Sequence, residues 1–170
     1  STETEVELHR VEDGESIRLR LRIRDGVLEQ VEVSRSTRDE REVELCLERT
    51  EANDDADMKG CLEVEQRDDG ARFELEVEDA APGRTLELVV IDPDGVEESQ
   101  GTLTVNLEGE AEWEFKTTAL PFSVLTVDEL EGYDVAVRDS VTGTNLLVGS
   151  IPELPASAPS DADDEESDDD

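Results

Sequence analysis

Aromatic side chains are scarce in this 170-residue sequence, which holds three Phe, one Trp and one Tyr. A glycosidase places a carboxylic acid of raised pKa in an apolar cleft lined by aromatic rings, and so few aromatics make such a cleft hard to build. His9 is the only histidine, and no GxSxG motif supports a nucleophilic triad that would use it. The sequence therefore indicates a protein that is not an enzyme, with His9 at the surface.

Long apolar runs and basic residues are also lacking. No window approaches the ~18 consecutive apolar residues of a membrane-spanning helix, which excludes such a span. The formal charge of −34, from 49 acids and 15 bases, would repel phosphates and argues against nucleic acid as the main partner. Arg outnumbers Lys 13 to 2, and an acidic, Lys-poor surface resembles proteins of salt-loving organisms. An ordinary acidic protein with a solvated tail is the alternative.

The negative charge is distributed unevenly along the chain. Residues 1–50 carry a net charge of −5, residues 51–160 carry −21, and the last ten residues hold eight acids and no base. The nearly neutral first third is a candidate docking surface for the remainder or for another subunit. From Ile151 onward, prolines precede the acidic run, which predicts a Pro-rich linker and a disordered acidic tail over residues 153–170.

Alternation of apolar and polar residues dominates the rest, and no long stretch follows the helical period. Leu, Val, Ile and Phe make up 43 residues, above the ~20% below which a highly charged chain stays unfolded. Apart from the hairpin below, strands are predicted at 4–11, 43–47, 62–66, 72–78, 85–91, 102–107, 111–116, 133–138 and 146–151. About nine or ten short strands, each with about three inward residues, predict an all-β fold. We expect a single antiparallel β-sandwich, Ig-like or jelly-roll-like, over residues 1–152.

The clearest alternation, IRLRLRIR at residues 17–24, is followed by Asp25-Gly26 and a second strand, VLEQVEVS. A two-residue loop would pair apolar with polar positions. A three-residue loop with a bulge at Gly26 instead pairs Ile23 with Val27 and Leu19 with Val31, and it is the predicted hairpin. That register also sets Arg18 across from Glu32 and Arg20 across from Gln30.

The two cysteines, Cys46 and Cys61, flank a loop between two predicted strands. Pairing Leu45 with Leu62 and Val43 with Val64 gives one apolar face and sets the cysteines directly opposite each other on the other face. A register shifted by two residues keeps the apolar face and separates the sulfurs, so two free thiols remain the alternative. A disulfide favours an oxidising, extracellular setting in which a leader has already been removed, whereas reduced thiols would favour the cytoplasm.

A calcium site is the most credible small-ligand site in the sequence. In EANDDADMKG, Asn53, Asp55 and Asp57 have the 1, 3, 5 spacing of oxygen-ligand calcium loops. Met58 stands at the Gly position and Val64 at the bidentate Glu position, so the loop is not an EF-hand. A looser calcium site with Asp68 and Asp69 is the hypothesis, and a solvated polar loop is the alternative.

The strand at residues 17–24 concentrates basic residues, and its alternate positions form an arginine stripe: Arg18, Arg20, Arg22 and Arg24. The stripe is a candidate interface for an acidic surface, together with Val6 and Leu8 of the N-terminal strand. The alternative is pairing with Glu29 and Glu32 on the next strand.

These features support two hypotheses of function. The first is a non-enzymatic, extracellular, halophile-type structural or interaction module that assembles with copies of itself, as a filament or surface layer, or docks on another surface protein. Its N-terminal strand, expected to be unpaired, would exchange with or add to a neighbour's sheet edge. The second is a monomeric calcium- or ligand-binding accessory domain.

Overall fold

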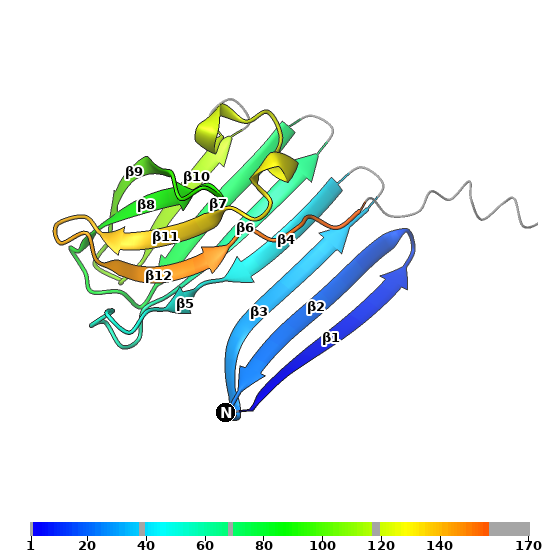
Figure 1. The fold of residues 1–170 in the computed structure, drawn as a ribbon, viewed down its shortest axis with the longest axis horizontal. Helices are drawn as coiled ribbons and strands as arrows, with labels where there is room; N and C mark the ends of the chain where they lie inside the picture. Colours follow the sequence, from blue (N-terminus) through cyan, green and yellow to red (C-terminus); the bar gives the residue numbers. More distant parts are fainter. Residues whose placement is uncertain (1, 38–39, 68–69, 117–119, 157–170) are drawn as a thin grey trace, which may run out of the picture.

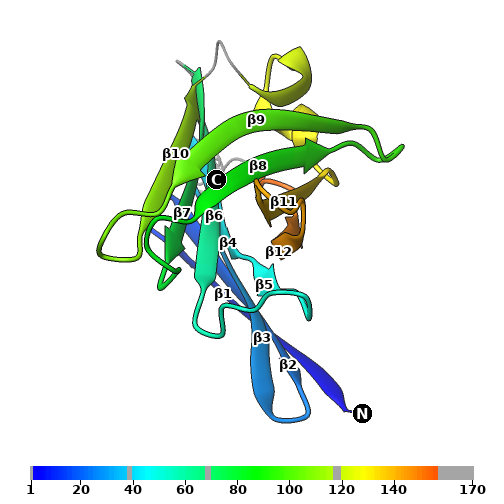
Figure 2. The same cartoon turned by 90° about the vertical axis from the view of Figure 1, so that its left-hand side faces the viewer.

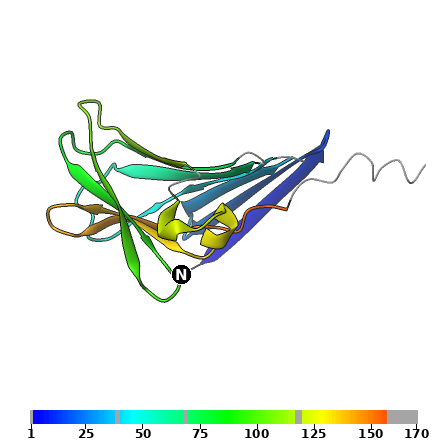
Figure 3. The same cartoon turned by 90° about the horizontal axis from the view of Figure 1, so that it is seen from above.

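The computed structural model describes residues 2–37, 40–67, 70–116 and 120–156. Within them the chain is all-β and contains two antiparallel sheets that pack against each other, so the predicted sandwich is confirmed (Figure 1). The larger sheet has the order β1-β2-β3-β4-β6-β7-β10 and the smaller one the order β5-β12-β11-β8-β9. Figure 3 shows the two layers from above, with β1 to β3 extending to one side.

The seven-stranded sheet consists of β1 (Glu3–Glu12), β2 (Glu15–Arg24), β3 (Val27–Ser36), β4 (Glu40–Cys46), β6 (Lys59–Arg67), β7 (Gly70–Glu78) and β10 (Ala111–Lys116). The five-stranded sheet consists of β5 (Glu48–Arg49), β8 (Thr85–Ile91), β9 (Glu97–Thr104), β11 (Asp134–Asp139) and β12 (Asn145–Ser150). Two short 3-10 helices, η2 (Pro121–Ser123) and η3 (Val127–Leu130), connect β10 to β11.

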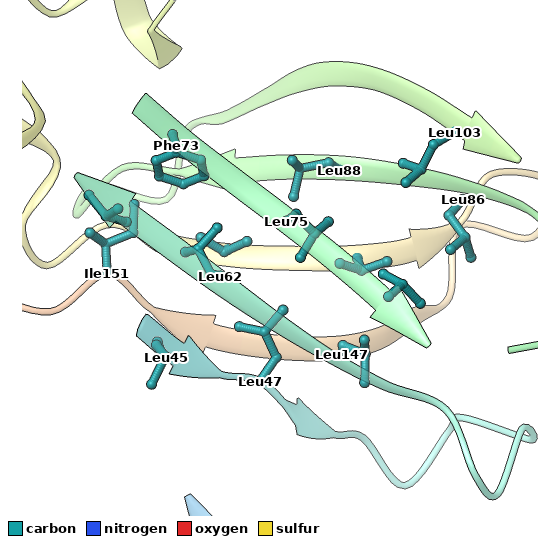
Figure 4. Packing of buried hydrophobic residues seen from close by; sticks show 14 of the residues in the cluster. Leu45, Leu47, Leu62, Phe73, Leu75, Leu86, Leu88, Leu103, Leu147 and Ile151 are labelled. Carbon is teal, nitrogen blue, oxygen red and sulfur yellow. The ribbon is translucent and has the colours of Figure 1, made fainter. Parts of the chain in front are cut away.

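The hydrophobic core lies between the five-stranded sheet and only part of the larger sheet. Figure 4 shows Leu62 and Leu75 of the larger sheet with Leu88 and Leu147 of the smaller one in this layer. All four side chains are fully buried. Alternate positions of β4, β6 and β7 supply the larger sheet's share because successive residues of a strand point to opposite faces. Leu154, in the segment predicted to be a linker, is also buried in this core.

The three N-terminal strands form a wing, defined as β1 to β3, that projects beyond the sandwich (Figures 1 and 2). β3 joins the wing to the body by pairing with β4 over residues 32–36. Two tight turns, Asp13-Gly14 and Asp25-Gly26, close its hairpins, and both residues of each turn have positive φ. This is the type I′ geometry that two-residue hairpin loops favour.

The predicted register of the second hairpin is wrong. The loop has two residues, with Arg24 paired to Val27, and a bulge on β3 at Glu29 shifts the register beyond it. Leu19 consequently faces Val33, and Arg20 faces Glu32. The bulge inserts one residue and so restores the pairing of apolar with apolar positions that a two-residue loop alone would lose.

Other boundaries differ less from the sequence expectations. The predicted strand 102–107 is Glu97–Thr104, because the chain turns at Asn106, whose side chain accepts hydrogen bonds from the backbone N–H groups of Glu108 and Glu110. The two-residue strand β5 is an addition to the expected set. The N-terminal strand is not unpaired, since β1 pairs along its whole length with β2. The predicted acidic tail falls mainly on residues 157–170, outside the described residues.

The predicted register of the cysteine-bearing strands is confirmed. Leu45 faces Leu62 and Val43 faces Val64, and Cys46 faces Cys61. The two cysteines form a disulfide on the outer face of the seven-stranded sheet. The bond links β4 covalently to β6 and closes the loop that carries Asn53.

Candidate docking surface

The polarity of the seven-stranded sheet reverses between β3 and β4. On the face that looks toward the core, β4 presents the buried Val43 and Leu45. Their register partners on β3 are Ser34 and Glu32. Directly paired residues share a face, so the core-side face of the wing is polar although the same face of the body is apolar.

The outer face of the wing carries the apolar residues instead. Register places nine of them together, and we call them the apolar field: Val6, Leu8, Ile17, Leu19, Leu21, Ile23, Leu28, Val31 and Val33. None of them belongs to the hydrophobic core cluster. Leu8 and Leu28 are 58% and 53% exposed. Within the described part of the chain, β1 and β2 make their main contacts with the other wing strands, and β3 also contacts β4.

The sequence prediction that every strand contributes inward residues to one core is therefore wrong for the wing. The alternating segment IRLRLRIR does form a strand, but alternation cannot tell which face a second layer will cover. The second layer here covers β4, β6, β7 and β10 and leaves β1 to β3 outside it (Figure 2).

Beyond β3 the outer face becomes acidic. Glu44 is the neighbour of Val33, and Glu42 is the neighbour of Arg35. Glu63, Glu74 and Glu114 continue the same surface on β6, β7 and β10, in register with Glu44. We call this surface, together with Glu65, Glu76 and Glu112 on those three strands, the acidic face. The apolar field thus stops where a dense row of carboxylates begins.

Mutual repulsion and burial perturb several groups of the acidic face. Burial raises the pKa of Glu42, Glu74 and Glu76 above the usual range, and neighbouring carboxylates reinforce the effect. Arg72 offsets part of this charge, with its guanidinium nitrogens 2.7 Å from Glu63 and 3.7 Å from Glu114. Holding so many like charges on one face opposes folding at low salt.

The predicted arginine stripe lies on the opposite, core-side face of the wing. Arg20 lies 3.4 Å from Glu7 and 3.4 Å from Glu32, so carboxylates of both flanking strands bracket it. Arg22 lies 3.4 Å from Glu3 and 3.8 Å from Glu48 of the five-stranded sheet. The pairing expected as the alternative, with Glu29 and Glu32, is present in the structure.

The remaining stripe residues complete this polar face. Arg24 lies 3.4 Å from Glu29. Arg18 faces Ser34 on one side and His9 on the other, and its Nε is buried without a hydrogen-bond partner within the described ranges. Burial raises the pKa of Glu32, while the charges of Arg20 and Arg18 act in the opposite direction. The candidate interface residues of the sequence therefore lie on two opposite faces, with Val6 and Leu8 on one and the arginines on the other.

The structure gives the proposed calcium-loop residues other contacts. Asn53 is buried, donates from its side chain to the carbonyl of Leu146, and accepts from the backbone N–H of Asp55. The Asp55 carboxylate accepts the N–H of Ala81 at 2.8 Å. Asp57 is exposed, and Asp68 and Asp69 lie outside the described residues. Within the described ranges, no group of three or more His, Cys, Asp or Glu side chains could hold a metal ion.

Asp54 and Asp55 instead take part in an ion-pair cluster around Arg84. The Arg84 guanidinium lies 3.2 Å from Asp54, 3.9 Å from Asp55 and 3.0 Å from Asp139. Backbone N–H groups of Thr142 and Val141, together with Arg84, lower the pKa of Asp139 below its usual range. This cluster ties the loop after β5 to the turn between β11 and β12.

A polar groove of about 520 Å³ separates the core-side face of the wing from the five-stranded sheet. Arg22 and Gln30 line it on the wing side, and Ile91, Ala136 and Val148 form part of the opposite wall. The groove is open to solvent, and the Arg22–Glu48 ion pair forms part of its lining.

No protein-family model matches this chain, and no curated protein matches its sequence. In the part of the chain that the structure describes, no helix is long and apolar enough to cross a membrane.

Proposed function

We propose that this chain is a non-enzymatic structural or interaction module that self-associates, or docks on a surface partner, through its wing. The observation that carries the proposal is the apolar field: nine apolar side chains on one face of three ten-residue strands, outside the core. Soluble monomers rarely expose a contiguous apolar area of this kind, and such areas usually mark interaction sites.

The distribution of charge supports the same function. The apolar field contains no ionisable side chain, whereas the chain as a whole carries −34. High charge elsewhere keeps separate copies soluble, and salt weakens the repulsion that opposes association. The module would therefore be soluble at low salt and assemble, as a filament or surface-layer component, at the high ionic strength that its composition suits.

An oxidising, extracellular location forms part of the proposal. The Cys46–Cys61 disulfide supports it, because such bonds persist mainly outside the reducing cytoplasm. The acidic, Arg-rich composition supports a salt-rich setting.

Measurement of molecular mass by light scattering tests the proposal. The full chain is examined from about 0.1 M to several molar NaCl, with and without calcium, because the Debye length falls from ~10 Å to under ~3 Å over this range. We expect a monomer at low salt and larger species at high salt. A strict monomer under every condition, with no partner retained, would contradict the assembly function.

Calcium binding distinguishes the alternative function, a monomeric calcium- or ligand-binding accessory domain, from self-assembly. Its predicted ligands Asn53 and Asp55 already bond to other groups of the chain, which weighs against calcium binding there. Calorimetry that shows stoichiometric calcium binding by a persistent monomer would favour the alternative.

A further inference from the structure

We infer that the occupant of the apolar field is a second copy of this chain, packed face to face around a two-fold axis that runs along β2. The inference rests on the proposed function and names the partner and the geometry of that same surface. Each copy would cover the field of the other, and the two wings would form a small sandwich with its own core. Sheets packed in this way lie about 10 Å apart with their strands within about 30° of each other.

The area of the wing is close to what a stable pair needs. Three strands ~4.8 Å apart, each with ten residues rising ~3.3 Å, present a face of about 470 Å². Two copies would bury about 940 Å² if the faces were flat, and the buried area is larger because the side chains make each surface uneven. Biological interfaces begin near ~1,000 Å² in total, so the wing face reaches the lower end of that class.

The distribution of charge favours the wing as the interface between two copies. Residues 3–36 hold nine acids and six arginines, a net charge of −3 out of −34. Contact through any other part of the larger sheet's outer side would bring two acidic faces together. Contact through the apolar field brings together nine uncharged side chains of each copy, with Arg10 and Arg35 beside Ile17 at one end, and the small net charge of the wing keeps the repulsion between copies low.

The distribution of charge also favours a two-fold axis along β2 over one perpendicular to the strands. A two-fold axis in the interface and perpendicular to the strands would lay β4 and β6 of one copy over β4 and β6 of the other. Glu44 and Glu63 would then face their own counterparts across the interface. An axis along β2 places β3 over the partner's β1, so the two acidic faces extend in opposite directions from the shared wing.

The edge strand of the wing, β1, is poorly suited to pairing with a strand of another copy, which favours face-to-face contact. β1 ends the sheet order, and four of its ten residues are glutamates: Glu3, Glu5, Glu7 and Glu12. Charged side chains along an edge strand discourage pairing with another strand. The edge of a second acidic copy would meet the same obstacle, whereas the nine residues of the apolar field are uncharged.

Cross-linking of two matched cysteine variants tests the geometry in the full chain. Leu21→Cys lies on β2 within the apolar field, and Arg20→Cys is its neighbour on the opposite face. Both native cysteines are bonded to each other and do not react with a maleimide. A short bismaleimide spans the distance between packed sheets. In molar salt we expect Leu21→Cys to give a covalent dimer, with at least tenfold less dimer from Arg20→Cys.

Charge insertion gives a second measurement that does not depend on the cross-linker. Leu8→Glu introduces a carboxylate at an already exposed edge of the field, so the monomer should keep its fold, which circular dichroism checks. We expect its dissociation constant in molar salt to rise at least tenfold. Val141→Glu, at an 86% exposed loop position, is the control and should dimerise like the wild type.

The outcomes separate the two proposals. Salt-dependent association that persists in Leu8→Glu, with equal cross-linking of the two cysteine variants, would overturn the face-to-face geometry and leave self-assembly standing. Absence of association in the wild type at every salt concentration would overturn self-assembly itself. A third outcome is that the chain forms no dimer but binds a different protein, which shields the cysteine of Leu21→Cys from maleimide. That outcome would assign the apolar field to a surface partner and overturn the proposal of a second copy.

Discussion

Ser34 of β3 and Val43 of β4 face each other on the same side of the seven-stranded sheet, and the polarity of the sheet changes between them. Both side chains are buried, at 4% and 0% exposure. On the side of Val43 the sheet belongs to a core closed by the second layer. On the side of Ser34 it belongs to a wing whose apolar face points the other way. The molecule thus consists of a two-layered sandwich and a single-layered wing.

This division predicts unequal local stability, which hydrogen exchange measures. Small sheets with an uncovered apolar face are marginally stable, and segments with few buried apolar contacts open most easily. At low salt we expect backbone amides of β1 and β2 to exchange at least tenfold faster than those of β6 and β7, a difference of ~1.4 kcal/mol in opening free energy. In molar salt, association should slow exchange in the wing. Equal protection of wing and body at low salt would contradict the division.

The cysteine strands show how far sequence can predict register. Three constraints agree there, since Leu45 pairs with Leu62, Val43 pairs with Val64, and both sulfurs then lie opposite each other. The sandwich class also follows from sequence, because alternation and turn residues are local properties.

The wing shows what local patterns leave open. The two-residue loop and the bulge at Glu29 each shift the register by one residue, so the partner of Arg20 is Glu32 and not the expected Gln30, and no residue type marks a bulge of this kind. Which face of β2 is covered depends on where the second sheet ends, and that is decided by the topology of strands far along the chain. The nearly neutral charge of residues 1–50 covers the wing, but it also covers β4 and β5 of the body, so it does not locate the boundary between them.

Removal of the disulfide should destabilise the body without unfolding it. The bond joins residues 15 apart, and loop closure of that length contributes about 3 kcal/mol in the chain-entropy model. The Cys46→Ser, Cys61→Ser double variant should therefore lose about 2–4 kcal/mol in urea unfolding. The wild type under reducing conditions should lose a similar amount. A double variant as stable as the oxidised wild type would show that the strand register alone holds β4 to β6.

The core between the sheets should dominate the stability of the body. Phe73 is fully buried, and truncation of a buried Phe to Ala removes apolar contact and leaves a cavity. Phe73→Ala should cost about 3–5 kcal/mol in the free energy of unfolding. Leu107→Ala, at 89% exposure, is the control and should change it by less than about 0.5 kcal/mol. Similar losses in the two variants would contradict the assignment of this core.

The acidic face predicts a stability that rises on mild acidification at low salt. Burial, and then the charge of neighbouring glutamates, raises the pKa of Glu76 in the folded state. A carboxyl with a raised pKa opposes folding while it is ionised, and the penalty disappears as pH falls from the folded pKa to the unfolded value. The temperature of thermal unfolding should therefore rise as pH falls from 7 toward the ordinary glutamate pKa of 4.5.

Glu76→Gln isolates one contribution to this effect. The group is exposed, so removal of its charge should stabilise the protein at pH 7 by only about 0.5 kcal/mol, or about 1–2 °C. The upward shift on acidification should be smaller in the variant. Glu108→Gln, in the exposed turn before β10, is the matched control. If the melting temperature of the wild type fell steadily over this pH range, repulsion on the acidic face would not govern it.

The Arg84 cluster predicts the opposite pH dependence at Asp139. Hydrogen bonds from the backbone of Thr142 and Val141, with the charge of Arg84, lower its pKa in the folded state. A carboxyl with a lowered pKa stabilises the fold above its unfolded pKa, and that stabilisation is lost as pH falls through the folded value. Asp139→Asn keeps an acceptor oxygen but loses the charge that faces Arg84 at 3.0 Å.

We therefore expect Asp139→Asn to lose about 1 kcal/mol at pH 7, as measured by urea unfolding, because a charge-assisted hydrogen bond is replaced by a neutral one. Asp54→Asn is the control, since Asp54 also lies near Arg84, at 3.2 Å, but its side chain is 81% exposed. Its loss should stay below about 0.5 kcal/mol. Below the folded pKa of Asp139 the wild type and Asp139→Asn should converge, because both then carry a neutral side chain at this position. A difference that persists unchanged into that acidic range would mean that shape, and not charge, holds the loop after β5 against the β11–β12 turn.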